Sequence, residues 1–219
     1  RDLHSFPTRR SSDLLADSIN SMEDAPIELY KEFMGDIGNE VDRETKIIND
    51  LLSLVKMDKA AGDLNITNIN INELLEQILK RLRPIADKRN IDLILDSFRP
   101  VEADVDELKF TSAISNLVEN AIKYNVDDGW VRVSLDADHK FFYVTVADSG
   151  MGIPEDSLSR IFERFYRVDK SHSREIGGTG LGLAITRSTI GMHHGVIKVF
   201  SKEGEGTTFS VRVPLSYIP

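Results

Sequence analysis

The sequence Asn116-Leu-Val-Glu-Asn-Ala-Ile-Lys-Tyr124 has the spacing of an amphipathic helix. It places Asn116, Glu119, Asn120 and Lys123 on one face and leaves the other face apolar. An amide oxygen beside an ammonium group suits magnesium at a phosphate, because Mg²⁺ prefers oxygen ligands and takes few of them from protein. A solvated helix face would show the same stripe, so the assignment depends on the glycine motifs that follow.

The first of these motifs, Asp148-Ser-Gly-Met-Gly152, follows an expected strand over Phe141–Val146. We expect Asp148 at a sheet edge, where its carboxylate would accept a hydrogen bond from the amine of adenine. Guanine would present a second acceptor there and leave both unpaired. Gly150 and Gly152 would let the flat base approach the backbone. Asp and Gly are also common where a strand simply turns.

The second motif, Gly177-Gly-Thr-Gly-Leu-Gly182, opens a helix expected over Leu181–Met192. Glycines at a helix N-terminus expose N–H groups to phosphate. The motif is not a Walker A loop, because no Lys-Ser/Thr follows, and it is not a dinucleotide fingerprint, because no strand precedes it. Gly204 and Gly206, further on, are expected to form a plain hairpin turn.

Between the two motifs lies Ile161-Phe-Glu-Arg-Phe-Tyr-Arg167, within a stretch 154–168 expected to form short helices. We expect its three aromatic residues to anchor it, while Arg164 and Arg167 project toward the cleft, where a guanidinium suits phosphate oxygens. The loop 169–176, with Lys170, has the character of a lid over the nucleotide. A surface helix with scattered arginines is the alternative.

The remaining elements follow from periodicity. A long amphipathic helix is expected over Ala25–Ala60, and it needs a partner to bury its apolar stripe. Asn72 is expected to cap a helix over Glu73–Lys88, with Pro84 producing a kink or an early end. The expected strands are Ile91–Leu95, Pro100–Asp104, Trp130–Leu135, Val196–Ser201 and Thr207–Val213. We interpret His193 and His194 as a helix end favoured by the macrodipole, rather than as a metal site.

Composition limits the function further. The 219 residues are 41% hydrophobic and 29% charged, with a net charge of −9 and no cysteine. The negative charge argues against nucleic acid as a partner, and the absence of cysteine rules out a disulfide framework. No apolar run is long enough to cross a bilayer. Residues 4–14 resemble a translated sequencing adapter, so residues 1–14 are expected to be non-native or disordered.

Taken in order, these motifs and the terminal Gly204-Glu-Gly-Thr-Thr-Phe209 resemble the ATP-binding domain of bacterial sensor histidine kinases. The resemblance implies an α/β sandwich of the Bergerat type, with a mixed sheet covered on one face by three helices, over residues 62–219. It implies that residues 15–61 hold only the second helix of a dimerisation and phosphotransfer hairpin. It also implies ATP and Mg²⁺ as ligands, a homodimer through the long helix, and a response-regulator receiver domain as partner.

The resemblance also assigns site residues. Asn120 is the expected magnesium ligand, with Asn116 beside it, Lys123 and Tyr124 as phosphate and nucleotide contacts, and Arg167 at the γ-phosphate. Asp148 is the expected adenine contact. The other expected nucleotide contacts are Gly150, Gly152, Lys170, Gly178, Thr179, Gly180, Leu181, Gly182 and Thr208.

The chain departs from the family pattern at the phosphoacceptor. None of its five histidines is followed by the Glu and Pro of the family's acceptor motif, so we expect ATP binding without autophosphorylation. The whole protein is expected to be a membrane sensor whose membrane segments are not in this chain, with this part in the cytoplasm. The alternatives are another ATPase of the gyrase and chaperone kind, which would lack the Phe-rich box, and a non-catalytic dimerisation module.

Overall fold

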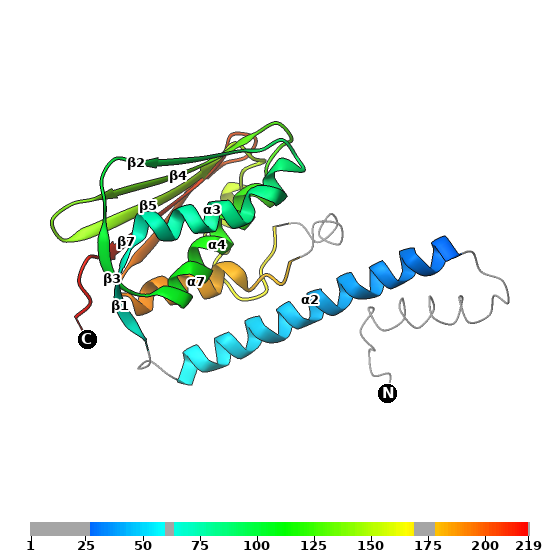
Figure 1. Cartoon of the computed structure of the whole chain (residues 1–219), viewed down its shortest axis with the longest axis horizontal. Helices are drawn as coiled ribbons and strands as arrows, with labels where there is room; N and C mark the ends of the chain where they lie inside the picture. Colours follow the sequence, from blue (N-terminus) through cyan, green and yellow to red (C-terminus); the bar gives the residue numbers. More distant parts are fainter. Residues whose placement is uncertain (1–26, 60–63, 169–177, 219) are drawn as a thin grey trace. The chain divides into compact units, whose positions relative to one another are not determined.

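A computed structural model describes residues 27–59, 64–168 and 178–218 (Figure 1). The chain divides into two compact units, Arg1–Asn49 and Asp50–Pro219. The helix α2, Ile27–Lys59, is the long helix expected from the apolar spacing. Its exposed face carries large apolar side chains, among them Ile37, Val41, Ile48 and Leu52. No described helix is long and apolar enough to cross a membrane.

The second unit, Asp50–Pro219, contains a five-stranded mixed sheet in the order β2-β4-β5-β7-β6. The strands are β2 Asp92–Ser97, β4 Trp130–Ala137, β5 Phe141–Asp148, β6 Val196–Lys202 and β7 Gly206–Pro214. β2 and β4 are parallel, and the other neighbours are antiparallel. A separate pair, β1 Ile66–Asn70 and β3 Glu102–Asp106, is antiparallel.

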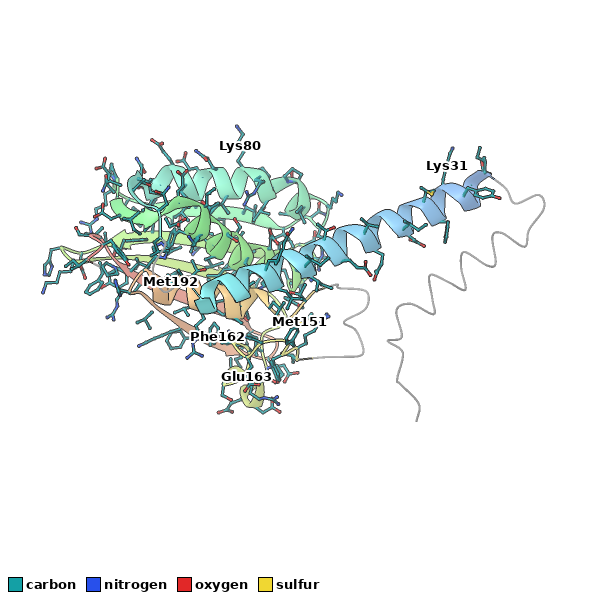
Figure 2. All side chains as sticks on the ribbon, turned by 90° about the horizontal axis from the view of Figure 1, so that it is seen from below. Lys31, Lys80, Met151, Phe162, Glu163 and Met192 are labelled. Carbon is teal, nitrogen blue, oxygen red and sulfur yellow. The ribbon has the colours of Figure 1, made fainter. Side chains whose placement is uncertain are left out.

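Three helices cover one face of the sheet (Figure 1): α3 Ile71–Asp87, α4 Glu107–Lys123 and α7 Gly182–Met192. The core lies between the layers, because alternate residues of β4 and β5 are buried against the helices. Phe110 of α4 and Phe142 of β5 are fully buried in it, with ring centroids 5.6 Å apart in an edge-to-face arrangement. In Figure 2, Lys80 extends from the solvent side of α3. The sheet and its three helices confirm the expected fold class.

The N-cap predicted for α3 is wrong. Its N-cap is Asn70, whose side chain accepts a hydrogen bond from the Glu73 N–H, and not Asn72. Asn72 instead joins α3 to the next loop, because its Oδ1 accepts from the Val101 N–H at 2.8 Å. The helix does not end early at Pro84, which lies inside it.

Three other predictions were misplaced. The strand expected at Pro100–Asp104 begins two residues later, as β3. In the stretch 154–168, the single helix is α5, Glu155–Leu158, and turns follow it. Asp148 does not lie at a sheet edge, since it ends β5, the central strand of the sheet.

Candidate nucleotide site

Asp148 is a buried carboxylate at the end of the central strand, with only 9% of its surface exposed. Its Oδ1 accepts hydrogen bonds from the N–H of Gly150 at 2.8 Å and of Thr207 at 3.2 Å. Burial raises the pKa of Asp148 to about 6, and the two N–H donors oppose that rise. Within the described part of the chain both bonds go to Oδ1, so Oδ2 is available to a ligand.

Glycines near Asp148 allow backbone segments to approach one another closely. A side chain on Gly150 would overlap the carbonyl oxygen of Tyr124, and one on Gly206 would overlap that of Asp148 itself. Gly206 has a φ of +97°, which a side chain would strain further. Sequence reasoning attributed Gly150 to an approaching base and Gly206 to a plain turn. The structure shows that both are needed by the protein's own backbone around the carboxylate.

The polar face of α4 is half-buried, as expected from its spacing. Asp106 caps the helix by accepting a hydrogen bond from the Lys109 N–H. Asn116 is occupied, because its Nδ2 donates to Thr186 Oγ1 at 3.0 Å and its amide packs on Gly182. The Asn120 side chain makes no hydrogen bond to any described residue, so its oxygen remains available to an ion.

Three cationic or hydroxyl groups surround Gly178 at the start of the glycine loop. A Cβ built there would lie 3.2 Å from Lys123 Nζ, 3.9 Å from Tyr124 Oη and 4.0 Å from Arg167. The Arg167 guanidinium also donates to the Gly178 carbonyl at 2.6 Å. The sequence predicted that these residues meet at a phosphate, and the structure brings them together.

The two ends of the site meet at Tyr124. Its carbonyl oxygen accepts from the Met151 N–H at 3.0 Å, which fixes the turn after Asp148 against the end of α4. Asn120 lies one helical turn earlier, and its carbonyl accepts from the Tyr124 N–H at 2.9 Å. A buried carboxylate and a group of cations therefore flank the same end of one helix.

Several expected contacts are placed differently. Leu181 is fully buried, and its N–H bonds to Thr179 Oγ1 at 3.1 Å, so it anchors the loop from the core. Thr208 pairs with Ala147, on the sheet face opposite Asp148, whereas Thr207 is the neighbour of Asp148. Phe165 does not anchor its segment, since it is 61% exposed.

The Phe-rich segment is nevertheless tied to the glycine loop. The Phe165 N–H donates to the Gly180 carbonyl at 2.9 Å, and Gly180 has a φ of +70°. Phe162 packs against Phe209 with ring centroids 6.3 Å apart, and Tyr166 donates to Ser157 Oγ at 3.0 Å. Lys170 lies outside the described residues.

Sequence reasoning missed Arg89, which closes the C-terminal end of α4. Its guanidinium donates to the carbonyls of Ile122, Lys123 and Asn125 at 2.8 to 3.1 Å and pairs with Asp127 at 2.9 Å. These bonds fix the end of the helix that carries Lys123. The partners of the Arg89 guanidinium all lie more than 30 residues away in the sequence, so no local pattern indicated them.

The buried Asn125 was missed as well. Its Nδ2 donates to the carbonyls of Ala121 and Trp130, both at 3.0 Å, and its Oδ1 accepts from Ser149 Oγ at 3.0 Å. It thereby joins α4, β4 and the residue after Asp148. The sequence did offer one signal for this role: Asn125 is the second residue after a helix, and a turn follows it.

His193 is a structural residue, as its position at the end of α7 suggested, although not through the macrodipole. Its Nε2 accepts from the Asp106 N–H at 2.9 Å, so its Nδ1 carries the proton and donates to the Thr189 carbonyl at 2.8 Å. Burial lowers its pKa. The ring is therefore neutral, so it is not a cation attracted by the dipole of the helix. No group of three His, Asp or Glu side chains suited to a metal occurs among the described residues.

The family of histidine kinase-, DNA gyrase B- and HSP90-like ATPases matches residues 105–217. The match runs from β3 to beyond β7 and contains both the Asp148 turn and the glycine loop. The chain belongs to this ATPase family.

Within the family, the chain is similar to sensor histidine kinases. Sensor histidine kinase WalK of Bacillus subtilis is 36% identical over 179 residues, 80% of this chain and 29% of WalK. Full-length ShkA in complex with AMPPNP is 26% identical with a TM-score of 0.76, covering 91% of this chain and 41% of ShkA. Histidine kinase ThkA in complex with response regulator TrrA is 25% identical with a TM-score of 0.73, covering 94% of this chain and 58% of ThkA.

These likenesses identify the chain as the catalytic ATPase domain of a two-component sensor histidine kinase, as predicted. The chain spans less than a third of the length of the WalK that it matches.

Proposed function

We propose that this chain binds ATP with Mg²⁺ and presents the γ-phosphoryl group to a histidine of a phosphotransfer helix. The observation that carries the proposal is the meeting of the Asp148 turn and the Gly178 loop at the C-terminal end of α4. Asp148 Oδ2 would accept from the adenine amine, and Lys123 and Arg167 would neutralise the phosphates. Such reactions depend mostly on positioning and charge stabilisation.

The Asn120 side chain fits magnesium. Its amide oxygen is a hard donor, and it is not used by any described residue. Asn120 would hold Mg²⁺ through this oxygen, and the ion would supply positive charge that offsets the charge of the phosphates. Asn116 would act differently, by holding Asn120's helix against α7 through Thr186.

Two partners belong to the proposal. The apolar stripe of α2 suits a second copy of the chain in a helical bundle. ThkA was solved with a response regulator, which supports a receiver domain as the final phosphoryl acceptor. The resemblance further supports a membrane sensor whose catalytic part is cytoplasmic.

Incubation with γ-labelled ATP tests the transfer step. We expect label on a separately supplied phosphotransfer hairpin from a related kinase, and none on this chain. Asn120→Ala should abolish the labelling, whereas His139→Ala, at an exposed turn, should leave it unchanged. Acid-labile, base-stable label on this chain would contradict the proposed division of roles.

A further inference from the structure

The strand β6 leaves one edge of the sheet open. It is the last strand in the order and pairs only with β7, from Val196 opposite Arg212 to Lys202 opposite Gly206. Its other edge has no strand partner within the described part of the chain. An edge strand carries a row of unpaired N–H and C=O groups, which can template a further strand.

A groove of about 560 Å³ follows this open edge. It is lined by Phe162, by Arg187 and Gly191 of α7, by Gly195, and by the β6 residues 196–200. Consecutive residues of a strand point to opposite faces of the sheet. All five residues 196–200 line the groove, so the groove runs along the edge of β6 and not over one face of the sheet. Gly191 forms an open part of the wall, since a Cβ there would meet nothing within 4 Å.

The groove is cationic on an acidic protein. Its charged lining residues, Arg187 and Lys198, are both basic, whereas the chain has a net charge of −9. Lys198 has no acidic partner among the described residues. Lys202, on the same face of β6, pairs with Glu205. The guanidinium carbon of Arg212 lies 4.8 Å from the centroid of the Phe141 ring, so this cation is also engaged. An occupant that is extended and acidic would complement this edge.

The alternation along β6 specifies the occupant further. Lys198, Phe200 and Lys202 share the solvent face, and Phe200 is 63% exposed. Cross-strand pairs of opposite charge, or of apolar side chains, stabilise a sheet. We infer that β6 binds an extended peptide strand with acidic residues opposite the two lysines and an apolar residue opposite Phe200. Its intervening apolar side chains enter the groove beside Gly191.

A second copy of the chain is the competing occupant. Antiparallel pairing of two β6 strands about Phe200 would place Lys198 of one copy opposite Lys202 of the other, which is unfavourable. Pairing β6 with β2 of another copy would place Asp92 and Asp96 near these lysines, but Asp96 already pairs with Arg132 at 3.4 Å. That contact is also head-to-tail, so it would produce rings or open chains whose mass grows with concentration.

The test uses the full chain and a fluorescent peptide, Gly-Asp-Val-Ile-Val-Asp-Gly. We expect saturable binding, with Lys198→Glu and Gly191→Leu each weakening it at least about tenfold, the second by filling the groove. Lys140→Glu, a lysine change at an exposed hairpin, is the matched control and should have no effect. Affinity for ATP should be unchanged in all three variants, because none of these residues lies at the nucleotide site. Absence of ATP binding by the parent chain would count against the proposed function and not against the groove.

Amide hydrogen exchange separates strand addition from charge attraction alone. Bound peptide should slow exchange of β6 amides that face the open edge, and replacing both aspartates of the peptide by lysine should remove this protection. Three results would overturn the inference: no saturable binding, equal binding to Lys198→Glu, or protection confined to other elements. If the mass of the parent chain rises with concentration, and Asp92→Lys removes this rise, the edge would instead be assigned to a second copy.

Discussion

Asp148 is a buried carboxylate, and its proposed role toward adenine requires it to be ionised. Its pKa is raised to about 6 from the ordinary 3.8, so the folded protein binds this proton more tightly than the unfolded chain does. Its contribution to stability is therefore greatest below pH 4 and is lost as the pH rises toward 6. The ionised form of Asp148, which is the form proposed to accept a hydrogen bond from adenine, predominates only above this range.

Nucleotide affinity should follow this titration. We expect ADP to bind more weakly as the pH falls through about 6, with a change of up to about tenfold per pH unit. Asp148→Asn should weaken binding at least about tenfold at pH 7.5, because an amide NH₂ would oppose the adenine amine. The variant should keep only the pH dependence of the phosphates themselves. Fluorescence titration of both proteins from pH 5 to 8 measures the difference, and parallel profiles would contradict the role of Asp148.

Among the elements, α4 and α7 depend on His193 for their mutual placement. The imidazole links the Asp106 N–H, at the start of α4, to the Thr189 carbonyl near the end of α7. It also packs edge-to-face on Phe110, with ring centroids 5.9 Å apart. Removal of the ring would leave a cavity and an unpaired N–H at the helix cap.

His193→Ala should therefore lower the free energy of unfolding by about 2–4 kcal/mol. Because burial lowers the pKa of His193, the unfolded chain takes up this proton more readily, and stability is lost as the pH falls below about 6.5. The variant should lack this acid-side loss. Urea unfolding at pH 5.5 and 7.5 measures both effects, with exposed His139→Ala as the control. Equal stability of His193→Ala and the parent protein would contradict the assignment.

The elements that could be predicted from sequence are those with a strong period and a nearby stop signal. β5 and β7 alternate cleanly, and α4 presents its polar face as expected. The cap of α3 was misassigned because Asn70 and Asn72 are both suitable N-caps two residues apart. Which of them caps the helix depends on the pairing of β1 with β3, which takes the chain up to Asn70.

The site was predictable in its motifs and less so in its details. Thr207 and Thr208 are chemically identical, and only the register against β5 shows which shares a face with Asp148. Arg89 and Gly206 act through partners distant in the sequence, so no local rule identifies them. Local patterns thus located the residues proposed to touch a ligand, whereas the residues that hold them in place could be found only in the tertiary structure.

At the scale of the whole molecule, α2 should make the chain a dimer. Ile48 and Leu52 are both exposed and lie four residues apart on the helix. We expect Ile48→Glu with Leu52→Glu to convert the dimer to a monomer, because charges would be buried in the interface. Nucleotide affinity should change less than about twofold. Light scattering coupled to size exclusion gives the mass, and a monomeric parent chain would contradict this role of α2.

The central claim is that Asp148 and Asn120 hold opposite ends of the same ATP. Calorimetric titration with ATP, with and without Mg²⁺, tests it most directly on the parent chain, Asp148→Asn and Asn120→Ala. We expect one nucleotide per chain, weaker binding to Asp148→Asn under both conditions, and loss of the magnesium enhancement alone in Asn120→Ala. No heat of nucleotide binding by the folded parent chain, or an unaltered magnesium enhancement in Asn120→Ala, would contradict the claim.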